Sequence, residues 1–266
     1  MIRRVFSPIT KRLPESNRLE RIWKLAQVDF KKRYYNNRLG LVWALLNPIF
    51  RIAVYYYVFT QIIKMERIEN YAIFLFCGLV AWLGFKEAAQ KGIGMIKTKK
   101  YLIVNIQFNH TDLFFSSTIS VFMGTMFNTV ALIIACLVAG ISMSINLLYI
   151  PLVFLNLFII GMGAAMILAT IRIYFDDIVH LWTMISLLGF WTSGVFLKGE
   201  IFLEQAPILL YIHPFIGIII NMRKVTMYSS PPDFFILGIN MTAALIILVV
   251  GIIVYKRNAH KAIENL

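Results

Sequence analysis

The stretch DFKKRYYNNRLGLVWALLNPIF, residues 29–50, joins a cationic, aromatic segment directly to the start of an apolar one. The cations include Lys31, Lys32 and Arg33, and the apolar part carries Pro48. Lysine and arginine are concentrated on the cytoplasmic side of membrane spans. The stretch therefore predicts the start of a membrane-spanning helix that leaves from the cytoplasmic surface.

The rest of the chain has the same apolar character. Of its 266 residues, 59% are hydrophobic, and the mean hydropathy is +0.75. A soluble domain of this size would be less apolar, and several apolar runs reach the roughly 20 residues that cross a bilayer as helix. The predicted fold class is an all-α polytopic membrane protein. The net charge of +13 is assigned to loops that follow the positive-inside rule rather than to a nucleic-acid partner.

The apolar runs predict six spans that form a single transmembrane domain, residues 1–266. The spans are expected at about 41–63, 71–87, 113–140, 147–171, 178–197 and 233–255. An even number of spans places both termini on one face, which then carries 20 lysines and arginines against 5 on the other face. This difference predicts a cytoplasmic segment 1–40, six spans within 41–255, and a cytoplasmic tail 256–266.

The segment before the first span shows the pattern of an amphipathic helix. Apolar residues recur at helical spacing, at Leu19, Ile22, Trp23, Ala26 and Phe30. A basic helix with one apolar face is expected to lie flat in the membrane interface, with its cations near lipid headgroups. The alternative is a helix packed on a soluble domain, and this chain contains no such domain.

The segment 198–232 is apolar but does not fit a span. Its apolar part, Pro207 to Ile220, is too short to cross a bilayer and is interrupted by Pro214. We expect a re-entrant or interfacial helical pair on the outer face. An ordinary amphipathic loop is the alternative.

The sequence contains no pattern that predicts an enzyme. Its four histidines are scattered, so no metal site is expected, and KGIGMIKTKK, residues 91–100, lacks the glycine–lysine spacing of a phosphate-binding loop. Asp176 and Asp177 are adjacent, so on a helix they would point in directions about 100° apart. We therefore expect no catalytic residue and no ATP site in this chain, and any ATP-driven activity would need a partner.

Candidate substrate contacts come from one arginine and from aromatic residues. Arg51 interrupts an apolar stretch, so it faces a polar cavity or snorkels to the interface; the sequence leaves both open. Aromatic rings can stack on sugar rings, although an interfacial aromatic belt explains most of those present. The candidates for a substrate path are Arg51, Tyr57, Trp82, Phe85, Phe190, Trp191 and Phe196.

The opening stretch resembles the start of the membrane subunits of type-2 ABC exporters of polysaccharides. The matching residues, in order, are Asp29, Arg33, Tyr34, Leu39, Gly40, Trp43, Asn47 and Pro48. IRIYFDDIVHLW (171–182) and YIHPFIGIIINMRKV (211–225) resemble two later family segments. They depart at Asp176, where arginine is usual, and at His213, where asparagine is usual. Arg172, one helical turn earlier, is expected to compensate for the first departure.

The resemblance implies a homodimer in a bacterial inner membrane, joined to two nucleotide-binding ATPase subunits. ATP and Mg would bind to those partners, and this chain would hold no cofactor. An undecaprenyl-diphosphate-linked glycan would pass between the two copies, and a helix at about 94–110 would contact the ATPase. Candidate contacts for the lipid diphosphate or the ATPase are Lys31, Lys32, Arg33, Lys97, Lys99 and Lys100.

These observations predict the permease subunit of an exporter of lipopolysaccharide O-antigen. Three alternatives remain. The first is an exporter of capsule or teichoic acid from the same family. The second is a type-2 exporter of small lipids or drugs. The third is a membrane-embedded glycan-processing enzyme, for which Asp176 and Asp177 would be the only candidate acids.

Overall fold

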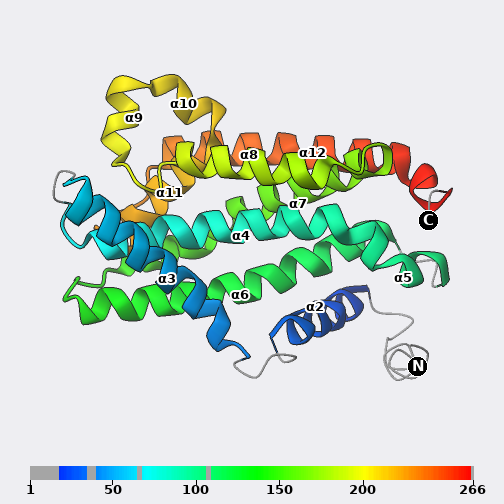
Figure 1. Ribbon diagram of the computed structural model, residues 1–266, viewed down its shortest axis with the longest axis horizontal. Coiled ribbons are helices and arrows are strands. Elements are labelled where there is room, and N and C mark those ends of the chain that lie inside the picture. The colour runs from blue at the N-terminus through cyan, green and yellow to red at the C-terminus, as the bar shows by residue number, and fades with distance from the viewer. Residues whose placement is uncertain (1–17, 35–39, 65–67, 106–108, 265–266) are drawn as a thin grey trace.

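The computed structural model describes residues 18–34, 40–64, 68–105 and 109–264. Within these ranges the regular structure is entirely helical. Figure 1 shows an elongated bundle in which the long helices run along the longest axis of the molecule. The predicted all-α polytopic class is confirmed.

Five helices in the described ranges are long and apolar enough to cross a membrane. They are α3 continued by the π-helical turn η1 (Val42–Ile62), α4 (Tyr71–Thr98), α6 (His110–Val138), the 3-10 turn η2 with α7 (Ile145–Tyr174), and the first part of α12 (Phe234–Asn258). The fifth predicted span corresponds to α8 (Ile178–Thr192), which is apolar but has only 15 residues. At 1.5 Å per residue it is about 22 Å long, shorter than a typical hydrocarbon core.

The core of the bundle is built around α4 and α7. The helix α7 packs most extensively on α12 and on α4. Small residues allow these close approaches, because Gly163 of α7 lies against the backbone of Leu248 and Gly92 of α4 lies against Ala165. Such small residues are typical of helix interfaces within membranes, where packing replaces the hydrophobic driving force.

Two helices lie at the edge of the bundle and expose apolar side chains. Little of α3 is buried, and its exposed residues include Phe50 and Val54. The helix α8 also turns apolar residues outward, among them Met184 and Leu188. In a membrane protein such faces meet lipid or another copy of the chain.

One end of the bundle carries the predicted segment that does not span. It forms three short helices, α9 (Gly199–Gln205), α10 (Pro207–Ile212) and α11 (Pro214–Thr226), rather than an irregular loop. Figure 1 shows α9 and α10 standing out from this end, while α11 turns back into the bundle. The helix α11 packs on α4 and α12, so most of its residues are buried. We call this end the outer end.

The opposite end, here called the inner end, carries α2 (Arg18–Tyr34), α5 (Lys100–Asn105) and the last turns of α12. The helix α4 continues through Thr98, well beyond the predicted span limit at residue 87. The short helix α5 then follows, so the predicted helical segment at about 94–110 is divided between α4, α5 and the start of α6.

The amphipathic helix α2 is present, but its apolar stripe does not face lipid along its whole length. Ile22 and Ala26 are buried within the protein, whereas Leu19 and Trp23 are exposed. The helix runs alongside the first half of α6. The prediction that the apolar stripe as a whole faces the membrane interface is therefore wrong for Ile22 and Ala26.

Candidate functional site

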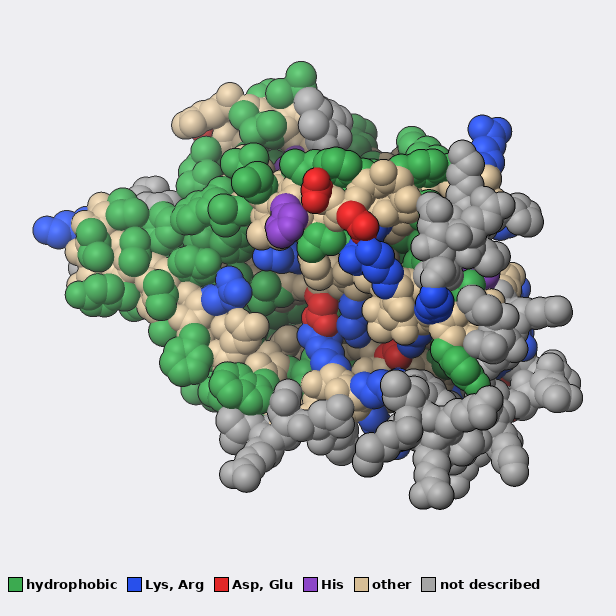
Figure 2. All heavy atoms as spheres, turned by 45° about the vertical axis from the view of Figure 1, so that its right-hand side comes forward, with side chains coloured by type: hydrophobic (Ala, Val, Ile, Leu, Met, Phe, Trp, Pro, Cys, Tyr) green, Lys and Arg blue, Asp and Glu red, His purple; other side chains and the backbone are tan. Residues whose placement is uncertain are grey.

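Charged side chains gather at the inner end. Figure 2 shows acidic and basic side chains interspersed over this end, next to an apolar surface on the flank of the bundle. The elements that supply these charges are α2, the last turns of α4, and the turn between α7 and α8. This arrangement places opposite charges in contact across helices that are far apart in the sequence.

Two of the predicted anion-binding cations are held by carboxylates. Arg33 of α2 forms an ion pair with Glu87 of α4, and Lys99 Nζ lies 2.7 Å from Asp29 Oδ2. The side chains of Lys99 and Asp29 are mostly buried. Arg33 and Lys99 therefore help to join α2 to α4.

Lys31 and Lys32 differ from Arg33 because both are exposed on the surface of α2. Lys100, at the start of α5, is also exposed. These three side chains can approach a charged ligand or a protein partner. That role stays a prediction.

The turn between α7 and α8 is tied to the end of α4. Lys97 Nζ donates a hydrogen bond to Asp176 Oδ1 at 2.7 Å, and Arg172 Nε reaches the same oxygen at 3.5 Å. The hydrogen bond from Lys97, supported by Arg172, lowers the pKa of the exposed Asp176 carboxyl. Arg172 Nη1 also donates to the carbonyl of Ile93 at 3.0 Å. Its compensation for the arginine that is usual at position 176 stays a prediction.

Arg51 is half-buried on α3. Its Nε donates to Asn47 Oδ1, one turn earlier, at 3.1 Å. It also lies close enough to Lys86 of α4 for the two positive charges to interact. The proposed part of Arg51 in a substrate path stays a prediction.

Most of the aromatic path candidates lie inside the chain. Trp82, Phe85, Phe190 and Phe196 are buried and belong to the main hydrophobic core. They form a continuous aromatic cluster, in which the Trp82 and Phe190 ring centroids are 6.0 Å apart. Residues in such a cluster would meet a passing glycan only if the surrounding helices separated.

The other two aromatic candidates lie on the surface. Tyr57 of α3 is 60% exposed and Trp191 of α8 is 50% exposed. Phe196 links the two edge helices, because its ring stacks on that of Trp191, with centroids 4.7 Å apart, and on that of Phe59 in η1, with centroids 4.9 Å apart. Exposed aromatic rings at the outer ends of α3 and α8 therefore lie next to the buried aromatic cluster.

Arg223 of α11 has a structural position that the sequence did not reveal. It is 2% exposed, and its guanidinium donates to the carbonyls of Gly194, Val195 and Leu197 at 3.0, 2.6 and 3.0 Å. Its Nε also donates to the carbonyl of Phe74 at 3.3 Å. Arg223 therefore joins α4 and the turn after α8 to α11. The only signal in the sequence was its place in the YIHPFIGIIINMRKV segment.

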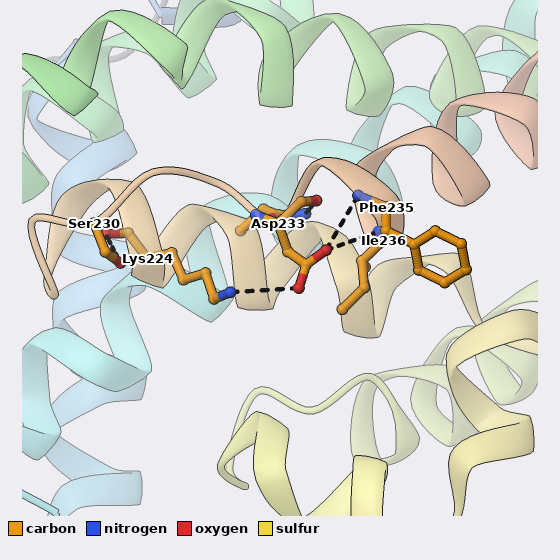
Figure 3. A network of polar contacts seen from close by, with 6 residues as sticks. Lys224, Ser230, Asp233, Phe235 and Ile236 are labelled. Carbon is orange, nitrogen blue, oxygen red and sulfur yellow. Dashed lines mark hydrogen bonds and ion pairs between the residues drawn. The ribbon is translucent and has the colours of Figure 1, made fainter.

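The junction between α11 and α12 is also held by polar contacts, which Figure 3 shows. Asp233 caps α12, because its Oδ1 accepts hydrogen bonds from the backbone nitrogens of Phe235 and Ile236, each at 3.1 Å. Its Oδ2 lies 3.5 Å from Lys224 Nζ. Together with Arg223, these contacts fix the position of α11 at the outer end.

The chain was compared with known proteins. No family model matches it. It is 21% identical over 239 residues to the O-antigen export system permease protein RfbA of Klebsiella pneumoniae, covering 90% of this chain and 92% of the relative. An RfbA of the same description from Myxococcus xanthus is 22% identical over 79% of this chain and 81% of the relative.

The chain is thus similar to polysaccharide export permeases along most of its length. It is also 21% identical, over 85% of its length and 86% of the relative, to the capsule polysaccharide export inner-membrane protein CtrC of Neisseria meningitidis serogroup A. These matches extend over most of the chain, so they confirm the resemblance to type-2 ABC exporter permeases that the motifs at residues 29–50, 171–182 and 211–225 indicated. The five long apolar helices also indicate a multi-pass membrane protein.

Proposed function

We propose that this chain is the permease subunit of an ATP-driven exporter of lipid-linked polysaccharide in a bacterial inner membrane, with O-antigen as its substrate. The observation that carries the proposal is the similarity to O-antigen export permeases over 90% of the chain. The helical bundle with five long apolar helices is consistent with it. Both termini would lie in the cytoplasm, because most of the lysines and arginines lie on their face of the membrane.

The energy for export would come from partner subunits. Two ATPase subunits would bind ATP and Mg and would dock at the inner end, where α5 and the exposed Lys31, Lys32 and Lys100 are accessible. This chain would hold no cofactor of its own. The charge pairs that connect α2 and the turn after α7 to α4 support this assignment, because they give the inner end a rigid surface on which a partner can act.

The glycan would cross the membrane between two copies of the chain. The edge helices α3 and α8 support this arrangement, because their exposed apolar faces leave room for a second copy and carry Tyr57 and Trp191. Sugar rings would pass these aromatic faces through weak, repeated contacts. The diphosphate of the lipid carrier would first meet cations at the inner membrane surface, where lysine and arginine attract phosphate.

A capsule polysaccharide is the second candidate substrate, because CtrC is similar to this chain over most of its length. The glycan-processing alternative has lost support. Asp176 is held by Lys97 and Arg172, which favours its charged form and leaves it poorly suited to proton transfer.

The proposal is tested with the complex purified by a tag on this chain and reconstituted into proteoliposomes. Lipid-linked O-antigen from the same bacterium is expected to stimulate ATP hydrolysis, whereas the undecaprenyl diphosphate carrier without glycan is expected to stimulate it much less. Capsule precursor is the second probe, and stimulation by it alone would reassign the substrate. If no lipid-linked glycan changes the rate of hydrolysis, the proposed function is wrong.

A further inference from the structure

Asp112, in the first turn of α6, is the one carboxylate that is fully buried among the residues that the structure describes. Its side chain is 1% exposed and forms ion pairs with two arginines of α2. Arg18 Nη2 donates to Oδ1 at 2.6 Å, Arg18 Nε lies 3.0 Å from the same oxygen, and Arg21 Nη2 lies 3.6 Å from Oδ2. Asp112 therefore connects the first turns of α2 to the start of α6.

The other end of α2 is fixed as well. Tyr34 packs against Gly124, the single glycine of α6, so closely that a Cβ at this glycine would lie 2.5 Å from the tyrosine hydroxyl. Asp112 and Gly124 are 12 residues apart on α6, and their partners Arg18 and Tyr34 are 16 residues apart on α2. The two helices thus run side by side in the same direction, as Figure 1 also shows.

Three charged residues of α2 pair with residues of opposite sign on other helices. Along α2, Arg18, Asp29 and Arg33 face Asp112 of α6, Lys99 at the end of α4, and Glu87 of α4, respectively. Asp112 is buried, whereas its partner Arg18 has a side chain that is 62% exposed. An ion pair with a buried partner adds little net stability, because desolvation offsets the attraction, but it can fix one register between two helices. These three pairs, spread along α2, therefore favour one position of the helix against α4 and α6.

We propose that Asp112 is the positioning residue that locks α2 to α6, so that α2, the inner half of α4 and α6 move as one body. The inference rests on the proposed function. Force that an ATPase applies at the inner end would then reach α4 and α6 directly. The edge helix α3 is little buried and lies outside this body.

The first experiment measures whether the lock holds α2. Ala26 of α2 is 0% exposed, so a cysteine at this position is expected to resist a maleimide in membranes, as the buried Cys77 and Cys136 do. In the Ala26→Cys background, Asp112→Asn and the double change Arg18→Gln with Arg21→Gln are each expected to expose the thiol. Arg18→Lys with Arg21→Lys keeps the charges and is expected to restore protection.

The matched control is Lys24→Gln, which removes the 2.6 Å ion pair between Glu20 and Lys24 on the exposed face of α2. This pair does not connect α2 to another helix, so the thiol at position 26 is expected to stay protected. If the thiol also stays protected in Asp112→Asn and in the double glutamine variant, the lock does not exist and the inference is overturned.

The second experiment measures the glycan exported for each ATP hydrolysed by the reconstituted complex. Asp112→Asn and the double glutamine variant are each expected to lower this ratio by about fivefold or more, while ATP hydrolysis continues. The double lysine variant and Lys24→Gln are expected to keep the wild-type ratio. If the thiol becomes exposed but the ratio of glycan exported to ATP hydrolysed does not change, the lock does not transmit force for export. The proposed function would then stand without it. If the wild-type complex exports no glycan, the proposed function is wrong, and so is the role of the lock in export. The maleimide labelling still decides whether Asp112 holds α2.

Discussion

At the scale of single residues, Arg223 makes the densest set of polar contacts inside the bundle. Its guanidinium donates hydrogen bonds to four backbone carbonyls, and its central carbon lies 3.3 Å from the centroid of the Phe74 ring. Three of these carbonyls belong to the turn after α8, and a buried carbonyl that loses its donor costs about 1–3 kcal/mol. One side chain thus determines where α8 ends and where α11 lies.

We predict that Arg223→Leu destabilises the protein by at least about 3 kcal/mol, because several buried carbonyls lose their donor at once. Unfolding in nanodiscs, followed by tryptophan fluorescence in denaturant, measures the change. Lys224→Gln is the control, because the partly exposed pair between Lys224 and Asp233 contributes at most about 1 kcal/mol. Equal stability of Arg223→Leu and Lys224→Gln would show that the carbonyl contacts of Arg223 do not hold the outer end together.

Asp233 gives the outer end a dependence on pH. Its pKa is lowered mainly by the backbone N–H of Ile236, with a further contribution from Lys224. The charged form therefore stabilises the folded state above the ordinary aspartate pKa of about 3.9, and this stabilisation is lost as the pH falls through the lower folded pKa. Asp233→Asn keeps an oxygen that can cap α12 but loses the charge.

The stability difference between wild type and Asp233→Asn is therefore expected to be largest near pH 6 and to shrink as the pH approaches 3. The melting temperature in nanodiscs, measured across this range, tests the prediction. A difference that does not vary with pH would mean that the charge of Asp233 contributes nothing to the junction between α11 and α12.

At the scale of helices, apolar length in the sequence predicted the long spans well, but it could not predict where two of them end. The helix α4 continues from residue 87 to Thr98 because its last turns are covered by protein, which a hydropathy pattern cannot distinguish from exposure to water. The helix α8 ends at Thr192, five residues before the predicted limit, and is followed by Gly194 at a φ of +84°. That turn is held by Arg223, a contact between distant parts of the sequence.

The candidate site was predictable only in part for the same reason. The cations near residue 31 could be found from composition, but their partners could not. Arg33 pairs with Glu87 and Lys99 with Asp29, across separations of 54 and 70 residues. Asp112 lay just outside the predicted third span, so nothing in its local sequence indicated that it would be buried.

The close contact between α7 and α12 provides a test at this scale. A Cβ at Gly163 would lie 2.7 Å from the backbone nitrogen of Leu248, and a backbone atom cannot move aside cheaply. Gly163→Ala is therefore expected to destabilise the protein by about 2 kcal/mol, as overpacking does. Denaturant unfolding in nanodiscs measures the effect.

Gly238→Ala is the matched control on α12, because a Cβ there meets nothing within 4 Å. It is expected to be neutral or to gain up to about 1 kcal/mol from helix propensity. If both alanine variants proved equally stable, the spacing between α7 and α12 would not depend on Gly163.

At the scale of the whole molecule, the charges and the exposed apolar faces lie in different places. The inner end carries paired charges that join helices to one another, and the edge helices α3 and α8 carry apolar and aromatic residues that no other part of the described chain covers. Such a division suits a subunit that receives force at one end and meets a second copy along its side. The substrate would then pass where the two copies meet.

The central claim is that this chain carries lipid-linked polysaccharide across the inner membrane with energy from a partner ATPase. The most direct measurement uses inverted membrane vesicles that contain the complex and lipid-linked O-antigen in their outer leaflet. After ATP is added, the glycan is expected to become protected from an added glycosidase, and vesicles without this chain should show no protection. If vesicles without the chain protect the glycan equally in the presence of ATP, the claim is contradicted.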